Sequence, residues 1–463
     1  MSGGSRALYR LAIALVSISL SACSVLPASA PDAPKRASRA VKVKDARGPL
    51  SAAQVKATLG RMSALDQPRR VLDRHLAIEQ ELAGTALSAG NQVTLLHDGP
   101  ATYRAMLAAI GKASKHINME TYIFDDDEVG QAFARALIEK QRQGVQVHLI
   151  HDSAGTFGTP AAFFEQLTES GIRVLPFNPV NPLKATKEWT VNQRDHRKLL
   201  IVDGKLAILG GINISRVYSG SGLHRSSRIS TDASLRWRDT DVQVQGPVVA
   251  DFQKHFLASW RSQHGPEPDT ASWFPPLANV GNDIVRAIGS RPDDGVSPIY
   301  TTLISAINAA ERHINITNAY FVPDPQLLNA LEAAALRGVQ VRLLLPSQTD
   351  SWLTFHAGRR YYSQLLAAGV RIYERRDVVL HAKTVSIDGV WSTVGSSNLD
   401  WRSFLHNQEL NAVILSIQFV QQLQQAFDRD LAESDMIELA QWHERPVDVR
   451  FKEWFAGVWE YWL

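Results

Sequence analysis

The sequence predicts an α/β protein built from two homologous halves, each with a mixed sheet between helices and with one active site at their pseudo-twofold interface. Three observations predict it. The chain has 463 residues, and single hydrophobic cores stop growing at about 250–300 residues, so two domains are expected. An internal repeat spans most of the chain. Finally, a histidine–lysine motif occurs once in each copy of the repeat.

The internal repeat consists of three segments that recur in the same order. The matching pairs are residues 113–119 and 310–316, residues 144–147 and 338–341, and residues 171–174 and 369–372. Both copies of the middle segment have the sequence Gly-Val-Gln-Val. Each half then reaches its own histidine–lysine motif. The repeat therefore predicts two copies of one fold.

Local patterns within each copy favour alternating helices and strands. Residues 131–142 and 326–337 have the apolar spacing of a helix. Each is followed by a glycine and then by an apolar run rich in β-branched residues, at 145–150 and 339–345. A glycine at the end of a helix followed by a strand is typical of α/β units.

The repeat and the intervening composition predict the domain boundaries. We expect the first domain at 88–270 and the second at 278–463, with a junction at 273–282 that is rich in proline and glycine. The preceding segment, 51–87, has a helical pattern, but its place in the fold is not predicted.

The N-terminal residues predict secretion and lipid attachment. Basic residues precede a short apolar run that ends in Leu-Ser-Ala-Cys at 20–23, which is the order of a secretory signal. The run is too short for a transmembrane helix, which needs about 20 apolar residues. Leu-Ser-Ala-Cys resembles a bacterial lipobox, whereas a plain cleaved signal with a chance cysteine is the alternative. We expect a signal peptide at 1–22, lipidation of Cys23, and a flexible tether at 23–50.

The lipobox indicates a bacterial cell-envelope protein that faces the periplasm on a lipid anchor. Ser24 after the cysteine favours the outer membrane, by analogy with the sorting rules of enteric bacteria. A tether of about 27 residues reaches about 30 Å as a coil, so the folded body would stay close to a membrane surface. The formal net charge of +3 is too weak to indicate a nucleic-acid partner.

Two motifs with identical spacing contain the candidate catalytic residues. Each has a histidine, a lysine two residues later and an aspartate seven residues later. These residues are His196, Lys198 and Asp203 in the first half and His381, Lys383 and Asp388 in the second half. A glycine and an asparagine then follow at fourteen and seventeen residues after the histidine, at Gly210 and Asn213 and at Gly395 and Asn398. One such match can arise by chance, but two with the same downstream spacing indicate a shared function.

The spacing predicts a β-hairpin in each half. Residues i and i+2 of a strand point to the same face, so each histidine is expected beside its lysine. Asp-Gly then supplies a turn, and the returning strand brings the asparagine towards the histidine. Gly210 and Gly395 are expected to leave room for a substrate phosphate to approach the main chain. Core histidines within hairpins are the alternative, which is disfavoured because a core needs no lysine on the same face.

These residue types suit reaction at a phosphodiester. Such a substrate is an anion, so catalysis needs charge neutralisation and a protonated leaving group. The two lysines and two asparagines supply charge and hydrogen-bond donors. One imidazole can form a covalent phosphohistidine while the other moves the proton, without a metal or other cofactor. Which histidine attacks stays open, and Asp203 and Asp388 are included as orienting or charge-balancing groups rather than as bases.

The two motifs resemble the paired HKD motifs of the phospholipase D superfamily, and their flanks resemble bacterial cardiolipin synthases. The matching stretches include residues 195–204, 210–214 and 237–240 in the first half and residues 380–383 and 395–400 in the second half. The resemblance covers about residues 90–463. It implies two phospholipase D-like domains that share one active site.

The resemblance also implies roles for individual residues. His196 would be the nucleophile and His381 the general acid and base. The substrate phosphate would be held by Lys198, Lys383, Asn213 and Asn398, with Gly210 and Ser396 as further substrate-binding candidates. Asp239 and Glu409 lie where the family often has polar partners for the histidines.

The implied activity is a phosphatidyltransferase that forms cardiolipin or a related phospholipid from phosphatidylglycerol. Hydrolytic release of phosphatidic acid is the alternative, followed by a nuclease of the same superfamily and by a lipid-binding lipoprotein without activity. Asp241 stands where a histidine is expected, which leaves the exact phospholipid pair open. The expected partners are a phospholipid substrate and a membrane surface, with no nucleic acid, and the sequence does not indicate an accessory protein.

A run of apolar side chains lies near the end of the sequence. Their spacing places them on one face of a helix; they are Phe451, Trp454, Phe455, Val458, Trp459 and Trp462. Such a stripe suits a lipid–water interface, and packing onto the second domain is the alternative.

Overall fold

The computed structural model describes residues 42–63, 75, 86–180, 192–220 and 236–463. All of them belong to a single compact unit of the chain, residues 31–463. The expected signal peptide, the lipidation site at Cys23 and most of the expected tether lie outside the described residues.

The first half alternates strands and helices as the repeat predicts. Its elements are β3 (Leu87–Leu96), α4 (Gly99–Lys112), β4 (His116–Thr121), α5 (Glu128–Arg142), β5 (Gln146–Asp152), α6 (Ala161–Glu169), β6 (Arg173–Phe177), β7 (Arg194–Asp195), β8 (Leu199–Val202), β9 (Leu206–Gly210), η2 (Arg216–Tyr218), β10 (Trp237–Arg238), β11 (Asp241–Gln245) and α7 (Val249–Ser262). The expected helix at 131–142 is α5, which Asp127 caps at its start by accepting from two main-chain N–H groups. Gly144 follows that helix with φ of 86°, a left-handed conformation that favours glycine.

The second half repeats this order and adds elements at its end. It contains β12 (Asp283–Ser290), η4 (Pro292–Asp294), α8 (Pro298–Ala309), β13 (His313–Thr317), α9 (Pro325–Leu336), β14 (Gln340–Pro346), α10 (Trp352–Arg359), α11 (Tyr362–Ala367), β15 (Arg371–Arg375), β16 (Val379–Leu380), β17 (Thr384–Ile387), β18 (Trp391–Gly395), α12 (Trp401–Leu405), β19 (Asn407–Leu415), α13 (Ile417–Ala432), β20 (Ser434–Met436), α14 (Leu439–His443), α15 (Val447–Gly457) and η5 (Glu460–Trp462). The expected helix at 326–337 is α9, and the strand after it is β14.

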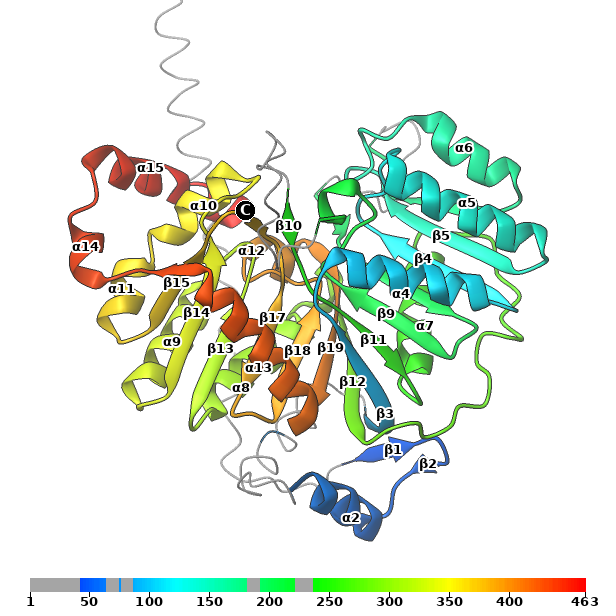
Figure 1. The fold of residues 1–463 in the computed structure, drawn as a ribbon, viewed down its shortest axis with the longest axis horizontal. Helices are drawn as coiled ribbons and strands as arrows, with labels where there is room; N and C mark the ends of the chain where they lie inside the picture. The colour runs from blue at the N-terminus through cyan, green and yellow to red at the C-terminus, as the bar shows by residue number, and fades with distance from the viewer. Residues whose placement is uncertain (1–41, 64–74, 76–85, 181–191, 221–235) are drawn as a thin grey trace, which may run out of the picture. The chain divides into compact units, whose positions relative to one another are not determined.

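One mixed sheet runs through both halves. In the first half the strand order is β6-β5-β4-β8-β9-β11-β3. In the second half the equivalent order is β15-β14-β13-β17-β18-β19-β12. The equivalent strands β3 and β12 pair antiparallel, with Asn91 opposite Asp283, and thereby join the two halves (Figure 1).

Helices cover both faces of this sheet. On one face of the first half, α4, α5 and α6 pack onto the strands through a core that includes Met106, Phe133 and Phe163. A second core contains Phe252 of α7 and Phe419 of α13 together with strand residues of both halves. The predicted α/β class, with a mixed sheet between helices in each half, is confirmed.

Residues from the expected tether take part in the sheet. Strands β1 (Val43–Asp45) and β2 (Gly48–Pro49) precede α2 (Ala52–Ser63), and β1 pairs parallel with the start of β3. The expectation of a flexible tether throughout 23–50 is therefore wrong for 43–49. The reason is that Val43 is buried and the ammonium of Lys44 lies 2.7 Å from a carboxylate oxygen of Asp251.

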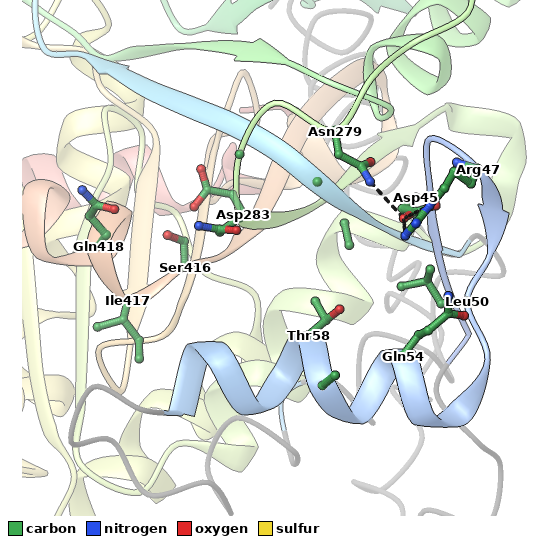
Figure 2. Close-up of a pocket in the computed structure, with 15 residues that line it drawn as sticks. Asp45, Arg47, Leu50, Gln54, Thr58, Asn279, Asp283, Ser416, Ile417 and Gln418 are labelled. Atoms are coloured by element: carbon green, nitrogen blue, oxygen red, sulfur yellow. Dashed lines mark hydrogen bonds and ion pairs between the residues drawn. The ribbon is translucent and has the colours of Figure 1, made fainter.

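A pocket of about 370 Å³ lies between α2 and the start of β12. Figure 2 shows Gln54 and Thr58 of α2 on one side of this pocket. On the other side, the amide of Asn279 donates to Asp45 at 2.9 Å. This contact ties the connection between α7 and β12, where the domain junction is expected, to the N-terminal strands. The exact domain limits stay a prediction.

Candidate active site

The two histidine–lysine segments lie just before a hairpin strand rather than within one. His196 and Lys198 lie between β7 and β8, and the second pair lies between β16 and β17. The expectation that these residues belong to the strands is therefore corrected. The cause is main-chain pairing across the halves: His196 N donates to Gln408 O at 3.0 Å and His381 N donates to Arg238 O at 2.8 Å.

Each lysine folds back onto the main chain of its own histidine. Lys198 Nζ donates to the carbonyl of His196 at 2.5 Å, and Lys383 Nζ donates in the same way to His381. Each ammonium also lies over a tyrosine ring: that of Lys198 over Tyr122 and that of Lys383 over Tyr320. Burial lowers the pKa of Lys198 to about 7 and that of Lys383 to about 8. Both lysines can therefore respond to the charge of a bound anion.

Each histidine takes its carboxylate partner from the opposite half of the chain. His196 Nδ1 lies 3.1 Å from Oε1 of Glu409, on β19 of the second half. His381 Nδ1 lies 2.7 Å from Oδ2 of Asp239, which follows β10 of the first half. The carboxylates suggested by the family resemblance are thus in contact with the histidines. Each half supplies the carboxylate for the histidine of the other half.

Both imidazoles are neutral at neutral pH. Burial, followed by the charge of Lys198, holds the pKa of His196 below its ordinary value. Burial and the charge of Lys383 hold the pKa of His381 well below that value. A carboxylate at Nδ1 accepts a hydrogen bond from the ring N–H there and leaves a lone pair on Nε2. Each histidine is therefore prepared to act through Nε2 as a nucleophile or a base.

The partner carboxylates differ in their own titration. Burial would raise the pKa of Glu409, but the hydrogen bond from the ring of His196, the charge of Lys198 and the hydrogen bond from Ser396 hold that pKa below its ordinary value. Burial raises the pKa of Asp239 to about 6, even though Lys383 and the Thr240 N–H act against it. Both carboxylates are ionised at pH 7. Because the pKa of Glu409 is lowered and that of Asp239 is raised, Glu409 stays ionised to a lower pH than Asp239 does.

The two histidines and the two asparagines line one pocket of about 300 Å³. The first half contributes Tyr122, Ile123, Arg194, His196, Asn213, Tyr218 and Trp237, and the second half contributes Tyr320, Asp350, Ser351, Thr354, His381, Asn398, Asp400, Arg402, Asn407, Trp462 and Leu463. The structure therefore brings together residues that lie far apart in the sequence. The pocket is built by both halves, as the predicted pseudo-twofold interface requires.

The asparagines are placed differently in the two halves. Asn213 accepts from Ile123 N at 3.0 Å and donates through Nδ2 to the hydroxyl of Tyr218 at 3.1 Å. That hydroxyl also lies 3.3 Å from His381 Nδ1. The buried Oδ1 of Asn398 has no hydrogen-bond partner among the described residues. Asn213 is thus held rigidly beside the second histidine, while Asn398 has hydrogen-bonding capacity to spare.

Asp203 and Asp388 do not reach the pocket. Each sits at the turn of its hairpin in a left-handed conformation, with φ of 52° and 54°. Asp203 accepts from the main-chain N–H groups of residues 114–116, and Asp388 accepts from those of residues 311–313. These contacts fasten the hairpins to β4 and β13, so the carboxylates support the fold at a distance from the histidines.

Three further candidates, Gly210, Gly395 and Ser396, contact neighbouring residues of the protein in place of a substrate. A Cβ atom at Gly210 would lie 2.0 Å from Asp241 Oδ1, and one at Gly395 would lie 2.0 Å from Asn411 Oδ1. The expectation that these glycines make room for a phosphate is therefore corrected, because neighbouring side chains fill that room. Ser396 donates to Glu409 and accepts from Leu410 N at 3.0 Å. Its hydroxyl orients the carboxylate partner of His196.

Sequence reasoning missed the aromatic wall of the pocket. Tyr122 follows β4 and Tyr320 follows β13, and their rings lie beside His196 and His381. Tyr122 comes six residues after His116, whereas Tyr320 comes seven residues after His313, so the repeat does not align the two tyrosines. Spacing within the repeat was therefore no signal for them. Trp237 has its ring centroid 4.8 Å from that of His381, whereas Asn407 stands at the equivalent position, two residues before the carboxylate partner of His196.

Comparison with known proteins decides the family. The model of a family described as "Cardiolipin synthase, PLD-like domain" matches residues 106–260 and 303–431. The chain belongs to this family. Cardiolipin synthase of Geobacillus kaustophilus is 35% identical over 370 residues, which cover 79% of this chain and 71% of that one. Cardiolipin synthase of Listeria monocytogenes is 35% identical over 373 residues, which cover 80% and 75% of the two chains.

A solved structure supports the fold of this cardiolipin synthase-family chain. The crystal structure of a phosphatidylserine synthase from Haemophilus influenzae matches with a TM-score of 0.64 and 15% sequence identity. The match covers 84% of this chain and all of that chain. Among the described residues, no helix is both long and apolar enough to cross a bilayer.

Proposed function

We propose that the protein is a phosphatidyltransferase that forms cardiolipin or a related phospholipid from phosphatidylglycerol through a covalent phosphohistidine. The observation on which the proposal depends is the single pocket lined by His196 and His381, each hydrogen-bonded to a carboxylate of the opposite half. The 35% identity to cardiolipin synthases over most of the chain supports the same reaction class.

In the first step, Nε2 of His196 attacks phosphorus and forms a P–N bond. The bond from phosphorus to the glycerol oxygen breaks, and that oxygen takes a proton from His381. His381 is neutral before the substrate binds, because its pKa is lowered. The negative charge of a bound phosphodiester raises that pKa and favours uptake of the proton that His381 then donates. We assign attack to His196 from the family resemblance, since each histidine has a carboxylate at Nδ1 and this contact does not distinguish the two.

In the second step, the acceptor alcohol completes the transfer. His381 removes the proton from its hydroxyl group, the oxygen attacks phosphorus, and the P–N bond breaks to release free His196. When the acceptor is a second phosphatidylglycerol, the products are cardiolipin and the glycerol that left in the first step. When water takes its place, the product is phosphatidic acid.

Charge stabilisation comes from the groups around the phosphate. The ammonium groups of Lys198 and Lys383 and the amides of Asn213 and Asn398 surround the histidines with donors. The phosphorylated imidazole of His196 is cationic, and the ionised carboxylate of Glu409 lies next to it. Preorganised donors and charges of this kind provide the largest single contribution to catalysis in many enzymes.

We further propose that the protein acts at the periplasmic side of the bacterial envelope, held by a lipid on Cys23, with Ser24 favouring the outer membrane. Its partners would be phospholipid and the membrane surface, with no nucleic acid. Palmitate labelling of the wild type, absent from Cys23→Ala, tests the anchor. A Cys23→Ala protein that still incorporates palmitate would contradict the proposed anchor.

The activity is tested with purified protein, phosphatidylglycerol vesicles and, separately, DNA, with products identified by mass spectrometry. We expect cardiolipin and glycerol, and no product from the His196→Ala or His381→Ala protein. Phosphatidic acid alone would indicate a hydrolase, and cleavage of DNA alone would indicate a nuclease. No product from either substrate would indicate a lipoprotein without activity. Because lysine ammonium groups and asparagine N–H donors, rather than a metal ion, would stabilise the charge of the phosphate, EDTA is expected to leave the rate unchanged.

A further inference from the structure

We infer that the protein meets the bilayer with an exposed aromatic rim around the catalytic pocket, formed by Phe157 of the first half and by Trp352, Trp454, Phe455, Trp459 and Trp462 of the second half. We call this set the aromatic rim. The inference rests on the proposed function, because it identifies the surface through which a phospholipid reaches that pocket.

The expected stripe on α15 is turned to solvent rather than packed onto the second half. The opposite face of α15 packs against α10, where Ala456 is fully buried and Glu453 pairs with Arg445 at 2.8 Å. Trp454 is 60% exposed and Trp459 is 48% exposed. The buried face anchors the helix, and the aromatic face is left without a partner among the described residues.

The exposed stripe is continuous with the catalytic pocket. Trp462, at the end of the stripe, lines the pocket together with Leu463 and both histidines. The carbonyl of Leu463 accepts from the main-chain N–H of Arg402 at 2.8 Å, which fixes this segment against α12 beside the pocket. Figure 1 shows α15 and α10 along the same edge as β10, the strand that leads to Asp239. An acyl chain leaving the pocket would therefore meet aromatic side chains.

Exposed aromatic residues flank the pocket from both sides. Trp352 is half-exposed and directly follows Ser351, which lines the pocket in the second half. In the first half, Phe157 is 78% exposed and lies in the loop after β5. That loop packs against the carbonyl of Tyr122, so closely that a Cβ atom on its Gly155 would lie 2.1 Å away. Tyr122 in turn lines the pocket.

A bilayer surface fits this rim better than a protein partner does. Phospholipid headgroups hold the scissile phosphate at the membrane surface, so the pocket mouth has to approach that surface. Tryptophan and phenylalanine bury favourably at the boundary between headgroups and acyl chains. A second copy of the chain on the rim would cover the pocket mouth and keep the lipid out.

Contact with the bilayer is tested with single-cysteine proteins, since Cys23 is the only cysteine of the chain. Trp459→Cys and Leu336→Cys are each made in the full chain with Cys23→Ala and labelled with a polarity-sensitive fluorophore. Leu336 is a matched control because it is 77% exposed but lies at the end of α9, and it does not line the pocket. Vesicles of phosphatidylglycerol with or without a quencher in the acyl region are then added.

We expect a blue shift and quenching at position 459 and no change at position 336. Because the label reports on one site, this result does not depend on how the N-terminal residues interact with vesicles. An unquenched label at 459 on vesicle-bound protein would overturn the inference. A label at 459 that shifts with protein concentration in the absence of vesicles would place a second copy there, which also overturns it.

A kinetic test separates surface contact from chemistry. The variant Trp454→Ser/Phe455→Ser/Trp459→Ser replaces rim residues that do not line the pocket. We expect its rate on phosphatidylglycerol vesicles to fall at least about tenfold below that of the wild type. On short-chain phosphatidylglycerol dispersed as monomers it is expected to keep the wild-type rate. Equal loss of rate on both substrates would contradict a docking role. A wild-type protein that is inactive on both substrates would contradict the proposed function, and the labelling experiment would then still test bilayer contact independently.

Discussion

The Nδ1 atom of His196 lies 3.1 Å from a carboxylate oxygen of Glu409, and the two residues come from opposite halves of the chain. The second histidine repeats the relation with Asp239 of the first half. Neither half therefore contains a complete histidine–carboxylate pair of its own. This exchange makes the junction between the halves part of the catalytic apparatus.

Replacing Glu409 by Gln should reduce kcat by about 10²- to 10³-fold, because a neutral amide cannot stabilise the cationic phosphoimidazole of His196. The change conserves shape and keeps an oxygen for the Nδ1 proton. Rapid-quench measurement of the phosphoenzyme should show that its formation is slowed. Asp239→Asn is the matched variant and should slow proton transfer at His381 instead. Equal phosphoenzyme formation in wild type and Glu409→Gln would contradict the assigned roles.

The alkaline side of the pH profile should follow the two lysines. Because their pKa values are lowered to about 8 and about 7, each loses its positive charge as the pH rises through these values in the free enzyme. We therefore expect kcat/KM to fall above pH 7–8. The fall in kcat should lie at higher pH, because a bound phosphodiester raises both lysine pKa values. Coinciding alkaline limits for kcat and kcat/KM would count against this explanation.

Replacing Arg197 by Met should lower the free energy of unfolding by about 3 kcal/mol. The guanidinium is fully buried and donates to Ser259 of α7, to the carbonyl of Ser290 on β12 and to the carbonyl of Glu409 on β19. It therefore ties elements of both halves together behind the histidine. Urea unfolding measures the loss, with the exposed Arg450→Met as control. Equal midpoints for the two variants would show that this network is dispensable.

Replacing Asp203 by Ala should destabilise the protein by about 2 kcal/mol while changing kcat less than about threefold at a temperature where the variant stays folded. Burial raises the pKa of this carboxyl, but main-chain N–H donors of Lys115 and His116 hold it below its ordinary value. Its contribution is thus present above the unfolded-state pKa and is lost as the pH falls through the folded-state pKa. A large drop in kcat for a folded Asp203→Ala protein would place the aspartate in the chemistry.

The sequence was sufficient to predict the α/β class, and it singled out two histidines that line one pocket in the structure. The repeated spacing after His196 and His381 corresponds to a β-hairpin in each half, β8–β9 and β17–β18. The helices α5 and α9 and the strands after them also appeared where periodicity and glycine placed them. These features depend on short-range preferences of the chain.

Features set by long-range contacts were not predictable in the same way. Residues 43–49 join the sheet because of a buried valine and an ion pair with a residue more than 200 positions away. The room beside Gly210 is filled by Asp241, which follows it by 31 positions. The aromatic wall was missed because a tyrosine after a strand has no distinctive spacing of its own.

The antiparallel pairing of β3 with β12 joins equivalent strands of the two copies. A contact between equivalent surfaces, related by a twofold axis, is the kind by which two identical subunits dimerise. A single half synthesised alone would present the same strand edge and could complete its histidine–carboxylate pairs only by association with another half. The covalent link between the copies therefore frees each motif to diverge, and Trp237 beside only one of the two histidines is an instance of such divergence.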